Sequence, residues 1–377
     1  VKIGLLTFRR NARNAGSTAH YIYHALAANP ENTVHHLSAD QAEQLAGTHL
    51  PARLARKAST FLSHASLRGR SFVQSNAERR YTKAAIEEAE EMGCDVIIGC
   101  FCANESDLLE KTRIPIVYIT DINSLQIKDR NQTGSALKVE RERLMFSLSS
   151  AMVLPSKFVA DSAVREYGAD PDSIHIVEWG GADKTSTEIS GEFGARSTEP
   201  FELLFIGHDR QRKGLDRAIS TVENLNARGI PVRLLTIGRN AEKIIDSRYV
   251  DDLGHLDLKH AGDRNVFEGA FARATCLLHP ARNEPYGHVL VEACTRSLPV
   301  VCTSVGGMSQ IIRNEVNGLL IPEPFEQARL DDAVCRLLQE PDLVSRLGAG
   351  ACLESQNRLN WSSWLDRVQP ILKSCTV

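Results

Sequence analysis

The chain has 377 residues, of which 42% are hydrophobic and 24% are charged, and its formal net charge is −3. This length suits two domains, and the composition excludes a disordered chain or one covered in nucleic-acid-binding charge. The apolar runs fall far short of the roughly 20 residues that cross a bilayer. Nine scattered cysteines without a Cys-x-x-Cys pair predict neither a disulfide framework nor a zinc site.

The chain opens with a predicted apolar strand over residues 1–8, a polar loop that contains Gly16, and a predicted helix from Thr18 to Ala28. Strand, loop and helix in this order are typical of an α/β unit. The loop lacks the Gly-x-Gly-x-x-Gly pattern, so the residues alone predict an ordinary turn and no dinucleotide site.

Residues 51–83 form an unusually basic segment, with eight Lys and Arg against one Glu, a net charge of +7 over 33 residues. Apolar residues recur at helical spacing beside Arg53, Arg56 and Lys57, which predicts a basic amphipathic helix. Such a helix suits an anionic membrane surface. A groove for an anionic acceptor and a solvated helix pair would produce the same pattern, so three interpretations stay open.

Two buried strands are predicted over residues 95–101 and 114–121, and the second ends at Asp121. Carboxyl ends of parallel strands line the ligand crevice of an open α/β sheet, which makes Asp121 a candidate site residue. A helix-capping role is the alternative. Another strand and helix are predicted over 151–167. Residues 183–199, rich in Ser, Thr and Gly without an apolar period, are typical of an interdomain linker.

A second α/β unit is predicted from the strand over residues 201–207. The turn that follows carries Arg212, Lys213 and Gly214, and fixed positive charge of this kind suits a diphosphate. Without further context it is an ordinary basic turn. A strand over 231–238, a short segment at 253–256 and a helix over 267–274 are predicted next.

The most informative stretch runs from residue 274 to residue 293. An apolar run ending at Pro280 predicts a buried strand, a polar turn contains Glu284, and a helix carrying Glu292 begins near Val289. A strand over 298–303 and the Gly306-Gly307 turn follow. We predict an anion site at the helix start after this turn.

Five features occur here in order: Glu284-x7-Glu292, Pro-Tyr-Gly at 285–287, Leu-Pro-Val-Val at 298–301, the Gly-Gly turn, and Asn-Gly-Leu-Leu-Ile-Pro at 317–322. Together they resemble the signature of the family-four retaining nucleotide-sugar glycosyltransferases of the GT-B fold, or glycosyltransferase group 1. The resemblance implies two Rossmann-like α/β domains facing across a cleft. It implies an acceptor-binding domain over 1–182, the linker over 183–199 and a donor-binding domain over 200–359, with 360–377 packing back on the first domain.

The resemblance also implies roles for individual residues. Arg212 and Lys213 would stabilise the leaving diphosphate, Glu284 would bind hydroxyls of the transferred sugar, and Glu292 would bind the ribose. Asp121 would orient the sugar or acceptor, because Thr-Asp stands after this strand in one subgroup where histidine is common in others. The further donor-binding positions that the resemblance implies are Gly16, Gly207, Gly254, His255, Leu256, Pro285, Tyr286, Gly287, His288 and Val289.

We therefore expect a metal-independent, retaining hexosyltransferase that takes sugar from a UDP- or GDP-sugar to a glycan, lipid-linked or small-molecule acceptor. It would need no cofactor and no nucleic-acid partner. A sugar-nucleotide epimerase or hydrolase, and a non-catalytic nucleotide-sugar-binding protein, remain open alternatives. We expect a cytoplasmic protein, either free or peripheral at the inner face of the membrane.

Two motifs are interpreted as structural. Asp170 and Asp172 match the Asp-x-Asp pattern of metal-dependent transferases, but we predict a turn there. His35, His36 and His279 lack metal-ligand spacing and are predicted to be strand or packing residues.

Overall fold

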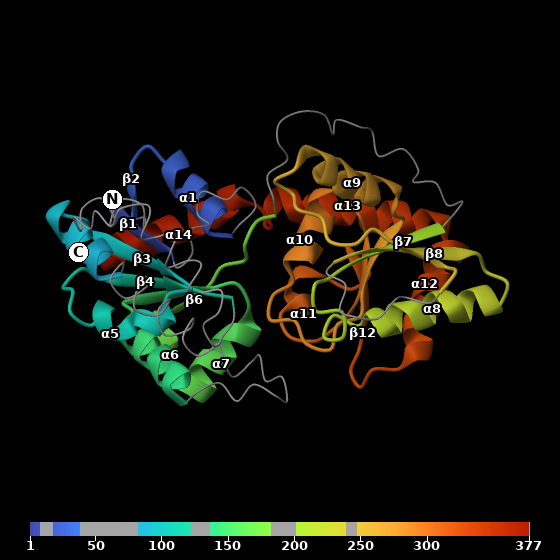
Figure 1. The fold of residues 1–377 in the computed structure, drawn as a ribbon, viewed down its shortest axis with the longest axis horizontal. Helices are drawn as coiled ribbons and strands as arrows, with labels where there is room; N and C mark the ends of the chain where they lie inside the picture. Colours follow the sequence, from blue (N-terminus) through green and yellow to red (C-terminus); the bar gives the residue numbers. More distant parts are fainter. Residues whose placement is uncertain (8–17, 38–81, 122–135, 182–200, 239–246, 377) are drawn as a thin grey trace, which may run out of the picture. The chain divides into compact units, whose positions relative to one another are not determined.

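The computed structural model describes residues 1–7, 18–37, 82–121, 136–181, 201–238 and 247–376. The chain forms two compact units, each built on its own sheet (Figure 1). The first unit comprises Val1–Leu154, Asp161–His175 and Arg367–Val377, and the second comprises Pro155–Ala160 and Ile176–Asp366.

The first unit contains a six-stranded sheet in the order β2-β1-β3-β4-β5-β6. Its strands are β1 (Lys2–Thr7), β2 (Thr33–Leu37), β3 (Val96–Cys100), β4 (Ile116–Ile119), β5 (Ala151–Leu154) and β6 (Ile174–Ile176). The strands β1 to β5 pair in parallel, and β3 and β4 are buried along their whole length. Helices therefore cover both faces of these strands, which explains their uninterrupted apolar sequence.

The described helices of the first unit include α1 (Thr18–Ala28), a helical stretch over residues 82–91, α5 (Ser106–Leu109) and α6 (Ala136–Leu148). The unit also contains α7 (Lys157–Tyr167) from Asp161 onward and the end of α14 (Trp361–Cys375). Helix α14 crosses from one unit to the other, and its residues from Arg367 onward belong to the first. There Gln369 and Asn32 exchange side-chain hydrogen bonds of 2.9 and 2.8 Å, and Lys373 pairs with Glu31 at 2.8 Å. The expectation that the C-terminal helix crosses back to the first domain is confirmed.

The second unit contains an all-parallel sheet in the order β12-β11-β10-β7-β8-β9. Its strands are β7 (Phe201–Ile206), β8 (Val232–Ile237), β9 (Val250–Asp252), β10 (Cys276–His279), β11 (Val300–Thr303) and β12 (Gly318–Ile321). Its further helices are α8 (Leu215–Ala227), α9 (Ala261–Arg273), α10 (His288–Thr295), α11 (Met308–Ile311), α12 (Gln327–Gln339) and α13 (Pro341–Asn357). Apolar residues of α8 and α12 pack with β7 and β8 in one buried core.

Strand order fixes where a ligand can bind in each sheet. In the second unit the chain runs outward from β7 to β8 and β9, then returns to place β10 on the other side of β7. The order reverses between β7 and β10, and the carboxyl ends at such a switch point form the ligand crevice of an open α/β sheet. The first unit has the equivalent reversal between β1 and β3.

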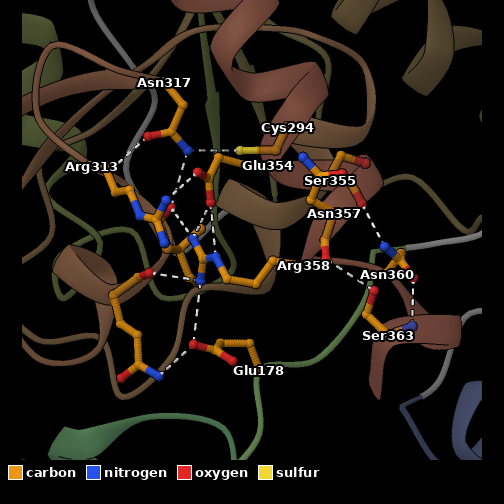
Figure 2. A network of polar contacts seen from close by, with 12 residues as sticks. Glu178, Cys294, Arg313, Asn317, Glu354, Ser355, Asn357, Arg358, Asn360 and Ser363 are labelled. Carbon is orange, nitrogen blue, oxygen red and sulfur yellow. Dashed lines mark hydrogen bonds and ion pairs between the residues drawn. The ribbon is translucent and has the colours of Figure 1, made fainter. Parts of the chain in front are cut away.

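A network of polar side chains fixes the segment after β6 to the second unit (Figure 2). Arg358 contacts Glu178 at 3.4 Å and Glu354 at 2.7 Å, and Glu354 also pairs with Arg313 at 2.6 Å. The amide of Gln310 donates a 3.0 Å hydrogen bond to Glu178. These contacts group residues 176–181 with the second unit, whereas the expected boundary placed them in the first domain.

Several finer expectations can be compared with the structure. The helix expected over 267–274 begins earlier, at Ala261. The Asp170-Pro-Asp172 motif is the predicted turn, in which the Asp170 carboxylate accepts a 3.1 Å hydrogen bond from the Asp172 amide. All nine cysteines are free thiols. The expected linker over 183–199 lies outside the described residues. None of the described helices has the length and hydrophobicity to cross a membrane.

Candidate functional site

The basic turn after β7 is fixed by glycines. Gly214 has φ +80°, begins α8, and lies so close to β10 that an added Cβ would be 2.0 Å from the Pro280 carbonyl oxygen. An added Cβ at Gly207 would be 2.9 Å from Cγ of Lys213. Only glycine at 214 allows both the left-handed conformation and this close approach. The turn therefore presents Lys213 at the switch point between β7 and β10.

A partly buried ion pair fixes the other side of the same turn. Arg210 is 9% exposed and donates two hydrogen bonds to Asp252, at 2.8 and 3.0 Å. Burial opposes ionisation of Asp252, but hydrogen bonds from Arg210 and Thr236 outweigh it and lower the pKa of this carboxyl group. Asp252 also accepts a 3.1 Å hydrogen bond from the amide of Gly254. The turn is thereby tied to the segment of Gly254, His255 and Leu256.

Glu284 lies at the centre of the charged residues. Its Oε2 atom contacts the Lys213 ammonium and lies 3.3 Å from Nε2 of His279 and 4.0 Å from the Arg212 guanidinium. The side chains of Glu284, Lys213 and Arg212 are 8%, 15% and 34% exposed. The turn and the Glu284 loop are also joined by the Arg212 guanidinium, which donates a 2.8 Å hydrogen bond to the Asn283 carbonyl. The Arg282 amide in turn donates a 2.8 Å hydrogen bond to the Arg212 carbonyl. Two cations and one carboxylate thus meet in a partly desolvated place.

The Gly306-Gly307 turn packs against the backbone of the Glu284 loop. Gly306 has φ +60°, and an added Cβ would be 2.0 Å from the Glu284 carbonyl oxygen. The Gly307 amide donates a 3.0 Å hydrogen bond to the same oxygen. The expected anion site is therefore wrong for Gly307, because its N–H already has an acceptor. The helix that follows, α11, has only the four residues Met308–Ile311.

The second half of the loop is anchored by an aromatic cluster. The Tyr286 hydroxyl donates to the Trp179 carbonyl and accepts from the Trp179 amide, both at 2.8 Å. Tyr286 is 1% exposed, so its side chain is structural, and only its backbone is available for the donor. The His288 ring lies 5.1 Å from the Trp179 ring. Burial, aided by the charge of Lys213, lowers the pKa of His288 to about 4.

Glu292 lies on α10, which begins after Gly287 at φ +106°. Burial raises the pKa of the Glu292 carboxyl group, partly offset by the positive charge of Arg296. The Arg296 guanidinium makes hydrogen bonds of 2.6 and 2.9 Å to Glu268. Because Glu292 is partly removed from water, a hydrogen bond from a ligand would stabilise its ionised carboxylate more strongly than the same bond would in water.

The sequence of this unit matches a known family. Residues 187–352 match the family described as "Glycosyl transferases group 1". We refer to this matched stretch as the group 1 domain.

Two relatives whose names state an activity match a larger part of the chain. The D-inositol 3-phosphate glycosyltransferase of Xylanimonas cellulosilytica is 29% identical over 244 residues, which is 59% of this chain and 57% of the relative. The lipopolysaccharide glucosyltransferase WaaG of Escherichia coli is 29% identical over 202 residues, 51% of this chain and 54% of WaaG. The chain thus spans little more than half the length of either relative.

Solved structures agree with the fold across nearly the whole chain. The sucrose-phosphate synthase of Thermosynechococcus elongatus has a TM-score of 0.70 at 15% identity, covering 99% of this chain and 98% of that one. HepE of Anabaena, solved with UDP-glucose, has a TM-score of 0.60 at 17% identity, covering 78% and 82%. At these identities the likeness shows the fold, and the α/β GT-B class is confirmed.

The group 1 domain brings together most of the predicted donor residues but not all predicted site residues. Asp121 follows β4 in the first unit and is half-buried. Gly16, Arg53, Arg56 and Lys57 lie outside the described residues. The described residues contain no group of three or more His, Cys, Asp and Glu side chains placed to hold a metal ion.

Sequence reasoning missed a contact of His279. It was predicted to be a strand or packing residue, and it is indeed the fully buried last residue of β10. Its Nε2 atom nevertheless contacts Glu284, five residues further along. A histidine at the carboxyl end of the switch-point strand, just before the loop with the candidate carboxylate, was the available signal.

Proposed function

We propose that this protein is a retaining glycosyltransferase that takes a sugar from a nucleoside-diphosphate sugar to a glycan, lipid-linked or small-molecule acceptor. The observation that carries the proposal is the meeting of Lys213, Arg212 and Glu284 at the switch point of a group 1 domain. Both curated relatives are glycosyltransferases by name, which supports the same reaction class.

The charges fit the departure of a nucleoside diphosphate. Negative charge grows on the leaving diphosphate as the bond to the sugar breaks, so cations held there in advance lower the barrier. Lys213 is 15% exposed and Arg212 is 34% exposed, so water screens them less than it screens surface charges. In this proposal Lys213 and Arg212 bind the diphosphate and supply the charge that a metal ion supplies in other transferases. No metal or cofactor is then required.

The two glutamates divide the rest of the donor between them. Glu284, beside Lys213, would accept hydrogen bonds from hydroxyls of the transferred sugar, and Glu292 on α10 would accept them from the ribose. They do not act as the acid and base of a glycosidase, whose carboxylates flank one bond. Substitution on the same face, with retention, fits this arrangement. Asp121 in the first unit would orient the acceptor or the sugar.

The donor and the location are the least constrained parts of the proposal. We propose UDP or GDP as the nucleotide, and the UDP-glucose complex of HepE supports UDP first. We also propose a cytoplasmic protein that lies at the inner membrane face when its acceptor is lipid-linked. The sequence of the basic segment 51–83 and the lipopolysaccharide substrate in the name of WaaG support this. Arg53, Arg56 and Lys57 would contact the anionic surface or acceptor.

Calorimetric titration of the protein with UDP, GDP, ADP and dTDP, with and without magnesium, tests the donor half. We expect one nucleotide to bind clearly without metal, and Glu292→Ala to weaken it by about 1–3 kcal/mol. Absence of binding to all four would refute the proposal. Turnover of the matching nucleotide sugar is then measured with and without acceptor extracts. Turnover without acceptor would identify a hydrolase or epimerase, and binding without any turnover a binding protein.

A further inference from the structure

We propose that His279 is a positioning residue that holds the Glu284 carboxylate in place when the donor diphosphate draws Lys213 away. This inference rests on the proposed function for the roles of Glu284 and Lys213. It adds a hydrogen-bond donor that no comparison assigns, on a residue buried too deeply to touch the donor itself.

The position of His279 is rigid. It is the last residue of β10, is 0% exposed, and lies with its ring stacked near Phe205, at 6.4 Å between centroids and 23° between planes. Its Nε2 atom is 3.3 Å from Oε2 of Glu284. A ring fixed by a strand and by close packing cannot follow the carboxylate, so the carboxylate must adapt to the ring.

The contact with Glu284 fixes the tautomer. An ionised carboxylate only accepts hydrogen bonds, so Nε2 must carry the proton and Nδ1 must be a bare acceptor. Nδ1 is buried and has no hydrogen-bond partner among the described residues. A buried acceptor without a partner destabilises a fold, and leucine would fill the space without this penalty. Packing alone therefore does not account for a histidine, whereas donation to Glu284 does.

His279 is a neutral donor. Burial, and then the positive charges of Lys213 and Arg212, hold the pKa of His279 well below its usual value. The three groups that face Oε2 of Glu284 therefore differ, with two cations on mobile side chains and one neutral N–H on a strand. A third cation here would repel Lys213 and Arg212, whereas a neutral donor does not.

Donor binding changes the partners of Glu284. Lys213 pairs with Glu284, and a diphosphate would compete with this carboxylate for the same ammonium. When Lys213 turns to the diphosphate, Glu284 loses its main cation and would rotate toward water. The hydrogen bond from His279 keeps Oε2 facing β10, which leaves Oε1 to accept from the sugar. His279 therefore acts on sugar recognition and leaves nucleotide recognition alone.

The test compares the affinities of UDP and UDP-glucose, with GDP and GDP-mannose as the second pair, in His279→Leu and His279→Gln. Leucine fills the space without a donor, whereas the glutamine amide can restore one. For His279→Leu we expect UDP affinity within about twofold of wild type and sugar-nucleotide affinity at least about tenfold weaker, the loss of a hydrogen bond to a charged group. Glutamine should recover most of that loss.

Glu284→Gln supplies the control background. There His279→Leu should have little further effect on UDP-glucose, because the charge that His279 positions is gone. Equal weakening of UDP and UDP-glucose by His279→Leu, or an undiminished effect in the Glu284→Gln background, would overturn the inference while leaving the transferase proposal intact. Failure of the wild-type protein to bind any nucleotide would refute both this inference and the transferase proposal.

A measurement on the wild-type protein without ligand keeps the inference testable when the leucine variant does not fold. Nitrogen-15 spectra of the histidine rings, assigned with His279→Gln, should show His279 protonated at Nε2 and bare at Nδ1. A proton on Nδ1 would rule out donation to Glu284 and overturn the inference.

Discussion

Tyr286→Phe is expected to destabilise the second unit by about 2–4 kcal/mol, because the change removes two buried hydrogen bonds and leaves the packing almost unchanged. The hydroxyl bonds both the amide and the carbonyl of Trp179 at 2.8 Å, and the two residues are 1% and 0% exposed. Each lost partner leaves a buried backbone group desolvated, which costs about 1–3 kcal/mol, and the retained ring avoids a large cavity. Tyr286 is two residues from Glu284, so nucleotide binding should weaken too.

Urea unfolding followed by tryptophan fluorescence measures this loss. All three tryptophans, Trp179, Trp361 and Trp364, lie in the second unit, so the signal reports the unfolding of that unit. The control is Tyr249→Phe, which removes a hydroxyl that contacts Arg248 at the exposed surface and should change stability by less than about 1 kcal/mol. A loss for Tyr286→Phe no larger than that of the control would refute the reasoning.

Three further changes test other parts of the second unit. Gly306→Ala should destabilise by about 2–3 kcal/mol and displace Glu284, because Cβ would lie 2.0 Å from its carbonyl oxygen. Gly262→Ala, with nothing within 4 Å, should be neutral or stabilising by about 0.5–1 kcal/mol in the same urea assay. Arg358→Met should lower the free energy of unfolding by about 3 kcal/mol, because Glu178 and Glu354 then stay buried with less positive charge beside them. Equal urea midpoints for this variant and the wild type would contradict this. The unfolded chain protonates His288 near pH 6.5 and the folded chain only near 4, so the unfolded state binds more protons between these values. The contribution of His288 to stability should therefore be constant above pH 6.5 and fall by up to about 3 kcal/mol on acidification to pH 4. The loss of stability on acidification should be smaller in His288→Gln than in the wild type by this amount.

Local signals were sufficient to predict the centre of the group 1 domain. The apolar run before Pro280, the glycine at 287 and the apolar start of α10 mark strand, loop and helix within twenty residues. Their order then places Glu284 at the carboxyl end of a strand, where the structure has it. The central parallel strands of both sheets were predicted for the same reason, since strands buried on both faces are continuous apolar runs. The partly exposed strands β2, β6 and β9 lack such a run, and no strand range was predicted for them.

Contacts between distant parts of the sequence could not be predicted in the same way. Arg210 and Asp252 are 42 residues apart, and Tyr286 and Trp179 are 107 apart. Nothing in their local sequence distinguishes them from exposed or packing residues. The helix α6 (Ala136–Leu148) was missed because charged residues interrupt its apolar face. Its buried residues are Glu142, Met145 and Phe146, which form no apolar period.

Backbone contacts, more than side-chain contacts, set the geometry of the candidate site. Gly214 lies against Pro280, and Gly306 lies against the carbonyl of Glu284, each at a distance that leaves no room for a Cβ. These two glycine contacts position the loops that carry Lys213 and Glu284. The ion pair between the two side chains tolerates small shifts, and in the proposed function Lys213 exchanges it for a contact with the diphosphate. If Lys213 binds the diphosphate as proposed, the site has to be held together by something other than that ion pair. The glycine contacts, and the hydrogen bond from His279 on its strand, are the parts that remain when the ion pair opens.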